Sequence, residues 1–229
     1  MQDNVIKLLD HGHVRLVESM GSDLSIVRNA RVSYDAEWRT GEDAGKDAKL
    51  IDYLVKNRHT SPFEAVTFTF DVKAPIFNFR QWHRHRTWAY NEISGRYAEL
   101  PEEFYVPIPA DITMQSTSNK QMRTDEQHPM AGHIAELIRD SCEASFRTYH
   151  ELIELNTPRE LARVVLPLGT YSHMFATVNL HNLMHFLGLR LHSHAQKEIR
   201  VYAEAMLELI EPIVPVSVAA FRKHKLAVA

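Results

Sequence analysis

The feature that most constrains the fold is a two-residue alternation across residues 66–73. The apolar positions are Val66, Phe68, Phe70 and Val72, and polar residues follow each of them. Successive side chains of a β-strand point to opposite faces, so this pattern predicts a strand with one packed face and one polar face. Antiparallel sheets commonly have such faces. A second strand is predicted at residues 170–177.

Helical periodicity accounts for most of the other segments. Helices are predicted at residues 24–32, 43–56, 76–82, 130–155, 180–189 and 195–210, with short ones starting near residues 158 and 215. Pro75 suits a first helical turn, and Thr157 to Glu160 resembles a capping box. The longest helix carries an apolar stripe that includes Cys142, Phe146 and Tyr149. The predicted class is α+β, an antiparallel sheet packed with several helices in a single domain over residues 1–229.

One segment lacks any such period. Residues 109–128 are polar, and they predict a long loop of the kind that is often functional or mobile.

Composition and charge exclude several classes of protein. The net charge of −3 gives no support for extensive nucleic-acid binding, so any basic site must be local. The sequence has no run of 18 apolar residues and no apolar signal-peptide core, so we expect no membrane partner. With Cys142 as its one cysteine the chain forms no internal disulfide, which fits a reducing compartment. We therefore expect a cytoplasmic protein.

The most unusual segment is residues 84–97. Three arginines, one acid, two small hydroxyls and three aromatic residues fall within it. Arginine binds phosphate through a planar fork and stacks on flat rings. Ser94-Gly95 suits a turn where the backbone approaches a ligand closely. Because the chain has no general basic excess, this segment predicts a local anion site.

The same segment carries a family resemblance. Arg84-His85-Arg86, seven residues and then Ser94 match the RHR-x7-S signature, and the sequence resembles the flavin-dependent thymidylate synthases. Further blocks agree in order, among them His59-Thr60-Ser61-Pro62-Phe63-Glu64, Ala162-Arg163-Val164-Val165-Leu166-Pro167, Thr177-Val178-Asn179 and Ser193-His194-Ala195-Gln196. The resemblance extends from about residue 13 to 223, and so many ordered blocks are far more specific than one motif.

The resemblance implies a reaction. Members of this family methylate dUMP to dTMP, with methylenetetrahydrofolate as carbon donor and NADPH-reduced FAD as hydride carrier, and they use no enzyme thiol as nucleophile. It also implies a homotetramer with active sites at the subunit interfaces. The sequence contains no GxGxxG fingerprint and no P-loop, so FAD would occupy a different kind of site.

The resemblance also implies roles for individual residues. The dUMP-binding positions are Gln81, Arg84, Glu92, Ser94, Gly95, Arg96, Arg163 and Arg190. The FAD-binding positions are His59, Ser61, Glu64, Arg84, His85, Arg86, Glu92, Asn179, His181 and His185. The catalytic positions are Arg190 and Ser94. A guanidinium keeps its proton, so Arg190 would activate the uracil ring by stabilising negative charge. His181 and His185 stand where the family often carries Arg and Asn, and Ser61 stands where Thr is common.

The residues leave three alternatives to weigh. Cys142 could be a nucleophile, but its place on an apolar helical stripe favours core packing. The spacing of His181 and His185, followed by His192 and His194, could hold zinc, but the HExxH glutamate and a cysteine ligand are missing, so we predict no metal in the site. Residues 84–97 could bind single-stranded nucleic acid by stacking, but a single basic patch in an acidic chain argues against a nucleic-acid partner.

Overall fold

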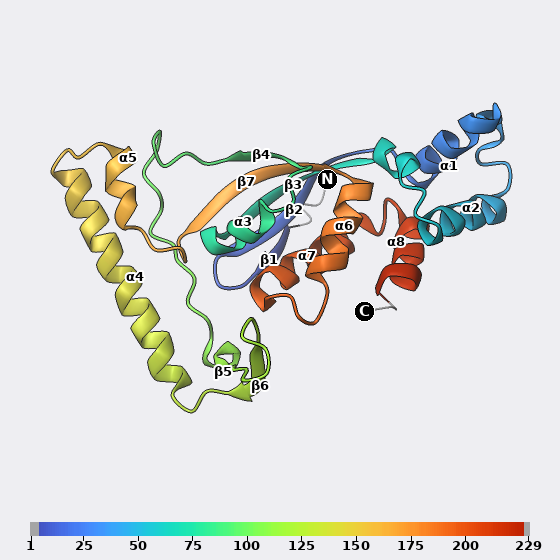
Figure 1. Cartoon of the computed structure of the whole chain (residues 1–229). Coiled ribbons are helices and arrows are strands. Elements are labelled where there is room, and N and C mark those ends of the chain that lie inside the picture. Colours follow the sequence, from blue (N-terminus) through green and yellow to red (C-terminus); the bar gives the residue numbers. More distant parts are fainter. Residues whose placement is uncertain (1–4, 227–229) are drawn as a thin grey trace.

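The computed structural model describes residues 5–226, and a five-stranded antiparallel sheet lies at its centre (Figure 1). In spatial order the strands are β1 Val5–Leu8, β2 Gly12–Met20, β3 Thr67–Pro75, β7 Tyr171–Asn179 and β4 Ala89–Glu92. β3 pairs with β2 on one side and with β7 on the other. The predicted antiparallel sheet is confirmed, and the two strands predicted from sequence are β3 and β7.

The alternation in β3 produces two unlike faces. Phe68, Phe70 and Val72 are fully buried, whereas Thr69 and Lys73 are half-buried on the opposite face. Three helices cover the apolar face, namely α3 Ile76–Trp82, α6 Leu180–Arg190 and α7 Lys197–Ile210 (Figure 1). Each fully buried side chain of this kind contributes about 1.5–3 kcal/mol. This shared core fixes α3 and α6 relative to each other, and both helices carry candidate site residues.

Three helices pack together at one end of the sheet, and two of them lie early in the sequence. They are α1 Asp23–Arg31, α2 Ala44–Lys56 and α8 Pro215–Phe221. The carboxylate of Asp23 accepts hydrogen bonds from the backbone N–H groups of Val216 at 2.8 Å and Ser217 at 3.1 Å. A side chain from α1 thus caps the start of α8. This contact connects a helix near the start of the sequence with one near its end.

The long helix stands apart from the sheet. We call α4 Ala131–Glu154 and α5 Arg159–Ala162 the α4–α5 arm (Figure 1). The arm has a small apolar cluster of its own around Phe146, Tyr149 and Ala162. The predicted stripe is buried at Cys142 and Phe146, but Leu137 is 54% exposed. The stripe is therefore covered toward the C-terminal half of α4, whereas Leu137 near its N-terminal end is exposed within the described chain.

The remaining elements are short. The 3₁₀ segments are η1 Val32–Tyr34, η2 Glu37–Arg39, η3 Ser61–Ala65, η4 Pro109–Asp111 and η5 Arg163–Val165, and a π-helical turn, η6 Arg222–Leu226, ends the described chain. Within residues 5–226 we find no helix both long enough and apolar enough to cross a membrane.

Several local predictions were incomplete or wrong. β1, β2 and β4 were not predicted from the sequence. β2 carries a register shift between Leu16 and Glu18, and such a bulge breaks the alternation that a strand would otherwise display. Pro75 is the last residue of β3 and the N-cap of α3, so it does not lie in the first turn. The capping box at residues 157–160 does not form, because α5 is a four-residue turn with Pro158 at its N-cap and no side-chain cap.

The polar segment 109–128 also differs from its prediction as a loop. It contains η4 and a two-stranded hairpin, β5 Thr113–Gln115 and β6 Arg123–Gln127. Both strands are mostly polar, so they lack the hydrophobic alternation by which strands are recognised. We refer to residues 109–128 as the β5–β6 hairpin.

Candidate functional site

Arg190 lies where α6 ends beside α3 and the loop that follows α3. Its Nε donates to Nε2 of His85 at 3.2 Å, and its Nη2 donates to the backbone oxygen of Gln81 at 3.1 Å. These bonds hold the guanidinium plane from two directions. Because a guanidinium has five N–H donors, three remain for a ligand. We call Gln81, His85 and Arg190 the Arg190 centre.

His85 is the electrostatic partner of Arg190. Burial, followed by the charges of Arg190 and His185, lowers the pKa of His85 to about 4. The geometry agrees, because His85 can accept from Arg190 at Nε2 only when that nitrogen carries no proton. The residue is only 7% exposed, and its ring packs against Phe186 with the ring centroids 4.9 Å apart. His85 is therefore a neutral acceptor that orients a cation.

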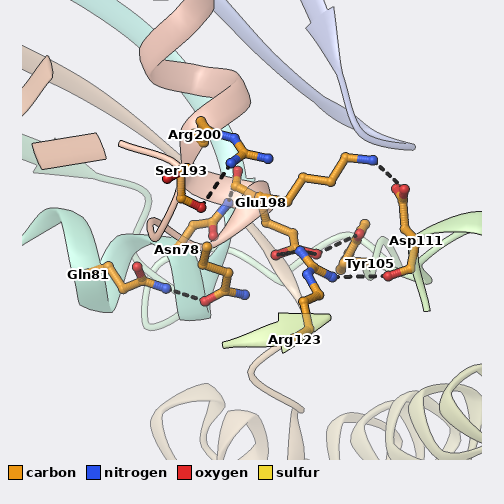
Figure 2. A network of polar contacts seen from close by, with 10 residues as sticks. Asn78, Gln81, Tyr105, Asp111, Arg123, Ser193, Glu198 and Arg200 are labelled. Carbon is orange, nitrogen blue, oxygen red and sulfur yellow. Dashed lines mark hydrogen bonds and ion pairs between the residues drawn. The ribbon is translucent and has the colours of Figure 1, made fainter. Parts of the chain in front are cut away.

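Gln81 connects the Arg190 centre to the start of α7. Its side-chain Nε2 donates to Oε1 of Gln196 at 2.5 Å, and Gln196 is the residue just before α7. Three residues earlier on α3, the buried Asn78 donates from Nδ2 to the backbone oxygen of Glu198 at 2.9 Å (Figure 2). Two amide side chains thus fix α3 against the first turn of α7.

Glu198 anchors a wider network next to this contact (Figure 2). Its carboxylate is almost fully buried, and Nη2 of Arg123 donates to both of its oxygens at 3.0 Å. Tyr105 adds a hydroxyl hydrogen bond to Oε1 at 3.2 Å. Arg123 also donates to the backbone oxygen of Asp111 at 3.1 Å, and the Asp111 carboxylate pairs with Lys197. The β5–β6 hairpin is therefore fixed to the helix that follows Gln196.

A polar cavity of about 510 Å³ lies between the β5–β6 hairpin and the turn from α6 to α7. Its walls include Gln115, Arg123, His194, Gln196 and Arg200. Because Gln196 also contacts Gln81, this cavity adjoins the Arg190 centre.

The other candidate dUMP residues gather between β4 and the α4–α5 arm. The turn after β4 presents Ser94 and Gly95, and a Cβ placed on Gly95 would lie 3.2 Å from Cδ of Arg163. The guanidinium of Arg96 pairs with Glu160 of α5 at 3.2 Å, and both side chains are exposed. We call Ser94, Gly95, Arg96 and Arg163 the arm-side group.

Two further candidates lie earlier in the same segment of the chain. Glu92 ends β4 and accepts a hydrogen bond from Ser172 Oγ at 2.6 Å, while Arg84 is exposed. Among the described residues, no direct hydrogen bond or ion pair joins the arm-side group to the Arg190 centre.

Three of the candidate FAD residues surround one cavity. His59, His181 and His185 line a space of about 440 Å³ whose apolar wall includes Phe63 and Met184. The ring of His185 lies 5.8 Å from the ring of His85, so this cavity neighbours the Arg190 centre. An apolar wall with a few convergent polar groups is typical of a cofactor pocket.

The other FAD candidates are more scattered. Ser61 and Glu64 are exposed on η3, which packs against α6. Arg86 is exposed in the loop after α3. The Oδ1 of Asn179 accepts from the backbone of Asn182 at 2.9 Å and caps α6. Its amide nitrogen is still available as a donor to a ligand.

Comparison with known proteins then identifies the family. The family described as thymidylate synthase complementing protein matches residues 15–216. A flavin-dependent thymidylate synthase of Treponema denticola is 49% identical over 97% of this chain and 84% of its own length. An enzyme of the same name from Thermus thermophilus is 48% identical over 96% of this chain and 79% of its own. The chain belongs to the flavin-dependent thymidylate synthase family.

A solved structure agrees with this family. The UMP/dUMP methylase PolB of Streptomyces cacaoi, bound with 5-Br dUMP, is 38% identical and superimposes with a TM-score of 0.87. The match covers 96% of this chain and 98% of that chain. The α+β class predicted from sequence is therefore shared with a relative that binds a deoxyuridine nucleotide.

Two alternatives to flavin chemistry are weakened by the geometry. Burial raises the pKa of the Cys142 thiol, and the side chain is buried on α4, as its helical spacing predicted. Within residues 5–226, His181, His185, His192 and His194 do not bring three metal-ligand atoms together. A thiol with a raised pKa is a poor nucleophile, and within the described residues these four histidines lack the three converging ligands that a zinc centre requires.

Glu198, Arg123 and Tyr105 were not among the residues predicted from the sequence to belong to the site. One signal for Glu198 was present, since it lies four residues before Tyr202 and eight before Met206, on the buried stripe of α7. An acid on such a stripe requires a partner. The partner is 75 residues away along the chain, so spacing alone could not identify it.

Proposed function

We propose that this protein converts dUMP to dTMP, taking the carbon from methylenetetrahydrofolate and the hydride from FAD reduced by NADPH. The observation that carries this proposal is Arg190, which is held by a neutral His85 and by Gln81 beside a cavity lined by histidines. Membership of the family supports the same reaction.

The first task of the residues is to activate the uracil ring. Arg190 is held by two of its five donors, and its remaining N–H groups can face the ring carbonyls. Its charge would stabilise the negative charge that develops as the ring carbon becomes nucleophilic. Because His85 is neutral, it orients the guanidinium without adding a competing positive charge. Ser94, the second proposed catalytic residue, would act from the turn after β4.

The second task is to hold the nucleotide. Arg96 and Arg163 are exposed arginines beside the turn at Ser94 and Gly95, and a phosphate dianion suits two forked donors and the N–H groups of a turn. Gln81, Arg84 and Glu92 would complete the dUMP contacts. Gly95 suits this role because a side chain there would press on Arg163.

The residues around the histidine-lined cavity fit a flavin. Apolar side chains such as Met184 offer a surface for a flat ring, and His59, His181 and His185 offer hydrogen bonds at its edges. Ser61, Glu64, Arg84, Arg86, Glu92 and Asn179 would supply the remaining contacts. When bound, the flavin supplies hydride chemistry that no side chain can provide.

We further propose a homotetramer with active sites between subunits. Two observations support it. The arm-side group and the Arg190 centre make no direct polar contact within residues 5–226, and the arm exposes Leu137 on an apolar stripe. A second copy of the chain could cover that stripe and bring its own arm-side group to the Arg190 centre.

The test is a reconstitution assay. Purified protein is stripped of flavin, and dTMP is measured with each of FAD, NADPH and methylenetetrahydrofolate omitted in turn. We expect turnover when all three accompany dUMP and none when any one is omitted. dTMP formation in stripped protein without FAD would overturn the proposal, and so would failure of the complete mixture with folded, flavin-loaded protein.

A further inference from the structure

A second cluster of reactive side chains lies on the sheet face opposite the covering helices. His13 is on β2, Asp71 on β3 and His173 on β7, three neighbouring strands. In the register, His13 and His173 both stand opposite Lys73, and Asp71 lies two residues from Lys73 along the central strand. Residues two apart on a strand share a face, so all three side chains project from the same side. Arg190 belongs to a helix on the other side (Figure 1).

The ligand atoms of these residues converge. Nε2 of His13 lies 3.2 Å from Oδ1 of Asp71, and Nε2 of His173 lies 2.5 Å from the same oxygen. All three atoms lie within 4.8 Å of one another. Two imidazole nitrogens and a carboxylate oxygen are three protein ligands of the type found in zinc sites that keep an open position.

The carboxylate is oriented by a fourth residue. Arg15 donates to the other oxygen, Oδ2, from Nε at 3.2 Å and from Nη2 at 2.9 Å. This fork fixes the carboxylate plane and leaves Oδ1 to the histidines. Outer partners of this kind commonly orient carboxylates that bind metals. The Asp71 side chain is 8% exposed, so it has little freedom to turn away.

The three side chains extend from rigid strands, and the two histidines reach a cavity on the surface. The three strands form the middle of the sheet, and sites on strands hold their geometry better than sites on loops. His13 and His173 also line a surface cavity of about 310 Å³, together with Lys73 and Glu103. A water molecule in this cavity could provide a fourth ligand.

We propose that His13, Asp71 and His173 form a binding site for a divalent transition metal, with Zn²⁺ as the best match. Each histidine would bind through Nε2 as a neutral imidazole, with its proton on Nδ1. Imidazole ligands favour Zn²⁺ and its neighbours over Mg²⁺ and Ca²⁺, which prefer oxygen. This site is separate from the proposed synthase centre, so metal binding here does not depend on whether the proposed reaction is correct.

The test uses the full chain, loaded with FAD, free of any affinity tag and treated with chelator. Co²⁺ serves as the visible probe, and Zn²⁺ is added as competitor. We expect one Co²⁺ per chain with the absorption bands of a low-coordinate site, and displacement of that Co²⁺ by Zn²⁺. His173→Phe should weaken binding by more than the roughly ten- to hundredfold loss caused by removing an outer partner.

Controls are essential in a chain with 14 histidines. His133→Phe is the matched control, because His133 is an exposed histidine on α4 near one carboxylate, Glu136. It should bind Co²⁺ as the unaltered protein does. Asp71→Asn should also weaken Co²⁺ binding, and if that variant fails to fold, His13→Phe and His173→Phe test the same site from its more exposed side. If the double variant His13→Phe, His173→Phe folds and binds Co²⁺ as tightly as the unaltered protein, the proposal is wrong. Loss of Co²⁺ binding in His133→Phe would also overturn it.

Discussion

Two regions, the central sheet with its covering helices (the sheet body) and the α4–α5 arm, hold their candidate site residues in different ways. In the sheet body, Arg190 is half-buried and bonded to His85 and Gln81, which lie beside a continuous core. On the arm side, Arg96 is exposed and its partner is the equally exposed Glu160. The first set is oriented by contacts within the chain, whereas the second has only a surface partner, which a phosphate would replace under the proposed function. Under the proposed function, orientation is therefore strongest where charge would develop during the reaction.

The most severe test of this contrast is Arg190→Lys. A lysine cannot donate to His85 and Gln81 and still offer a planar fork to the uracil ring. We expect kcat at saturating dUMP to fall by about 10²–10³-fold, the usual cost of losing a donor that stabilises developing charge. Steady-state kinetics on FAD-loaded protein would measure it, with the surface change Arg222→Lys as control. A wild-type kcat in Arg190→Lys would mean that Arg190 is a simple anchor.

Arg123→Ala tests the support behind the Arg190 centre. It leaves the buried Glu198 without its cation, and breaking a buried pair costs about 3–5 kcal/mol. Because Arg123 is one-third exposed, we expect a loss near the lower end, about 3 kcal/mol, in urea denaturation. Adding Glu198→Gln should recover part of the loss. Arg147→Ala, which breaks the surface pair with Glu143, should change stability by less than about 1 kcal/mol. An equal effect of the two arginine changes would contradict a supporting role.

The neutral state of His85 predicts a pH effect on stability. Its pKa is about 4 when folded and 6.5 ordinarily, so the unfolded chain binds more protons between these values. Stability should be full above about pH 6.5 and should fall by up to about 3 kcal/mol as pH drops to 4. In flavin-free protein, His85→Gln should remove this contribution, whereas His133→Gln should retain it. An unchanged acid limb in folded His85→Gln would show that another group is responsible.

On the arm side, Arg96→Ala and Arg163→Ala should mainly weaken substrate binding. Phosphate contacts exist in both the ground and transition states, so we expect kcat to change little. Losing a charged hydrogen bond worth about 1.5–3 kcal/mol should raise the KM for dUMP by roughly ten- to a hundredfold. Arg159→Ala is the control, because Arg159 lies on the same arm and pairs with Glu99. A large fall in kcat with an unchanged KM would contradict the assignment of substrate binding to the arm side and of ring activation to Arg190.

The smallest effect is expected for Cys142→Ala. The thiol is buried on α4, and burial raises its pKa, so it is a poor nucleophile. Turnover should stay within a few fold, and stability should fall by about 1 kcal/mol, as for a small buried truncation. Abolished turnover in folded, FAD-loaded protein would show that the arm takes part in the chemistry.

The elements with strong periodicity were predictable from the sequence, and those held by long-range pairing were not. β3 and α4 repeat their apolar residues at regular spacing, so each could be recognised on its own. β2 has a bulge, and the β5–β6 hairpin has polar strands, so their pairing depends on partners elsewhere in the chain. Local propensity cannot specify such partners.

The same distinction applies to the candidate sites. The segment 84–97 is contiguous, so its family signature could be read directly from the sequence. The pairing of Arg190 with His85 joins residues 105 apart, and Asp71 lies 58 and 102 residues from His13 and His173. Site residues that come from different strands and helices can be identified as neighbours only when the pairing of the strands and the packing of the helices are known.

The free-standing α4–α5 arm has a consequence for how such an enzyme responds to dilution. α4 contains 24 residues and is about 36 Å long, yet the apolar cluster beneath it centres on three buried side chains. In the proposed homotetramer, so small a cluster would leave the arm dependent on neighbouring subunits for its order, and subunit association follows mass action. Affinity for the nucleotide phosphate would then rise with enzyme concentration, even though Arg190 and its partners are fully built within each chain.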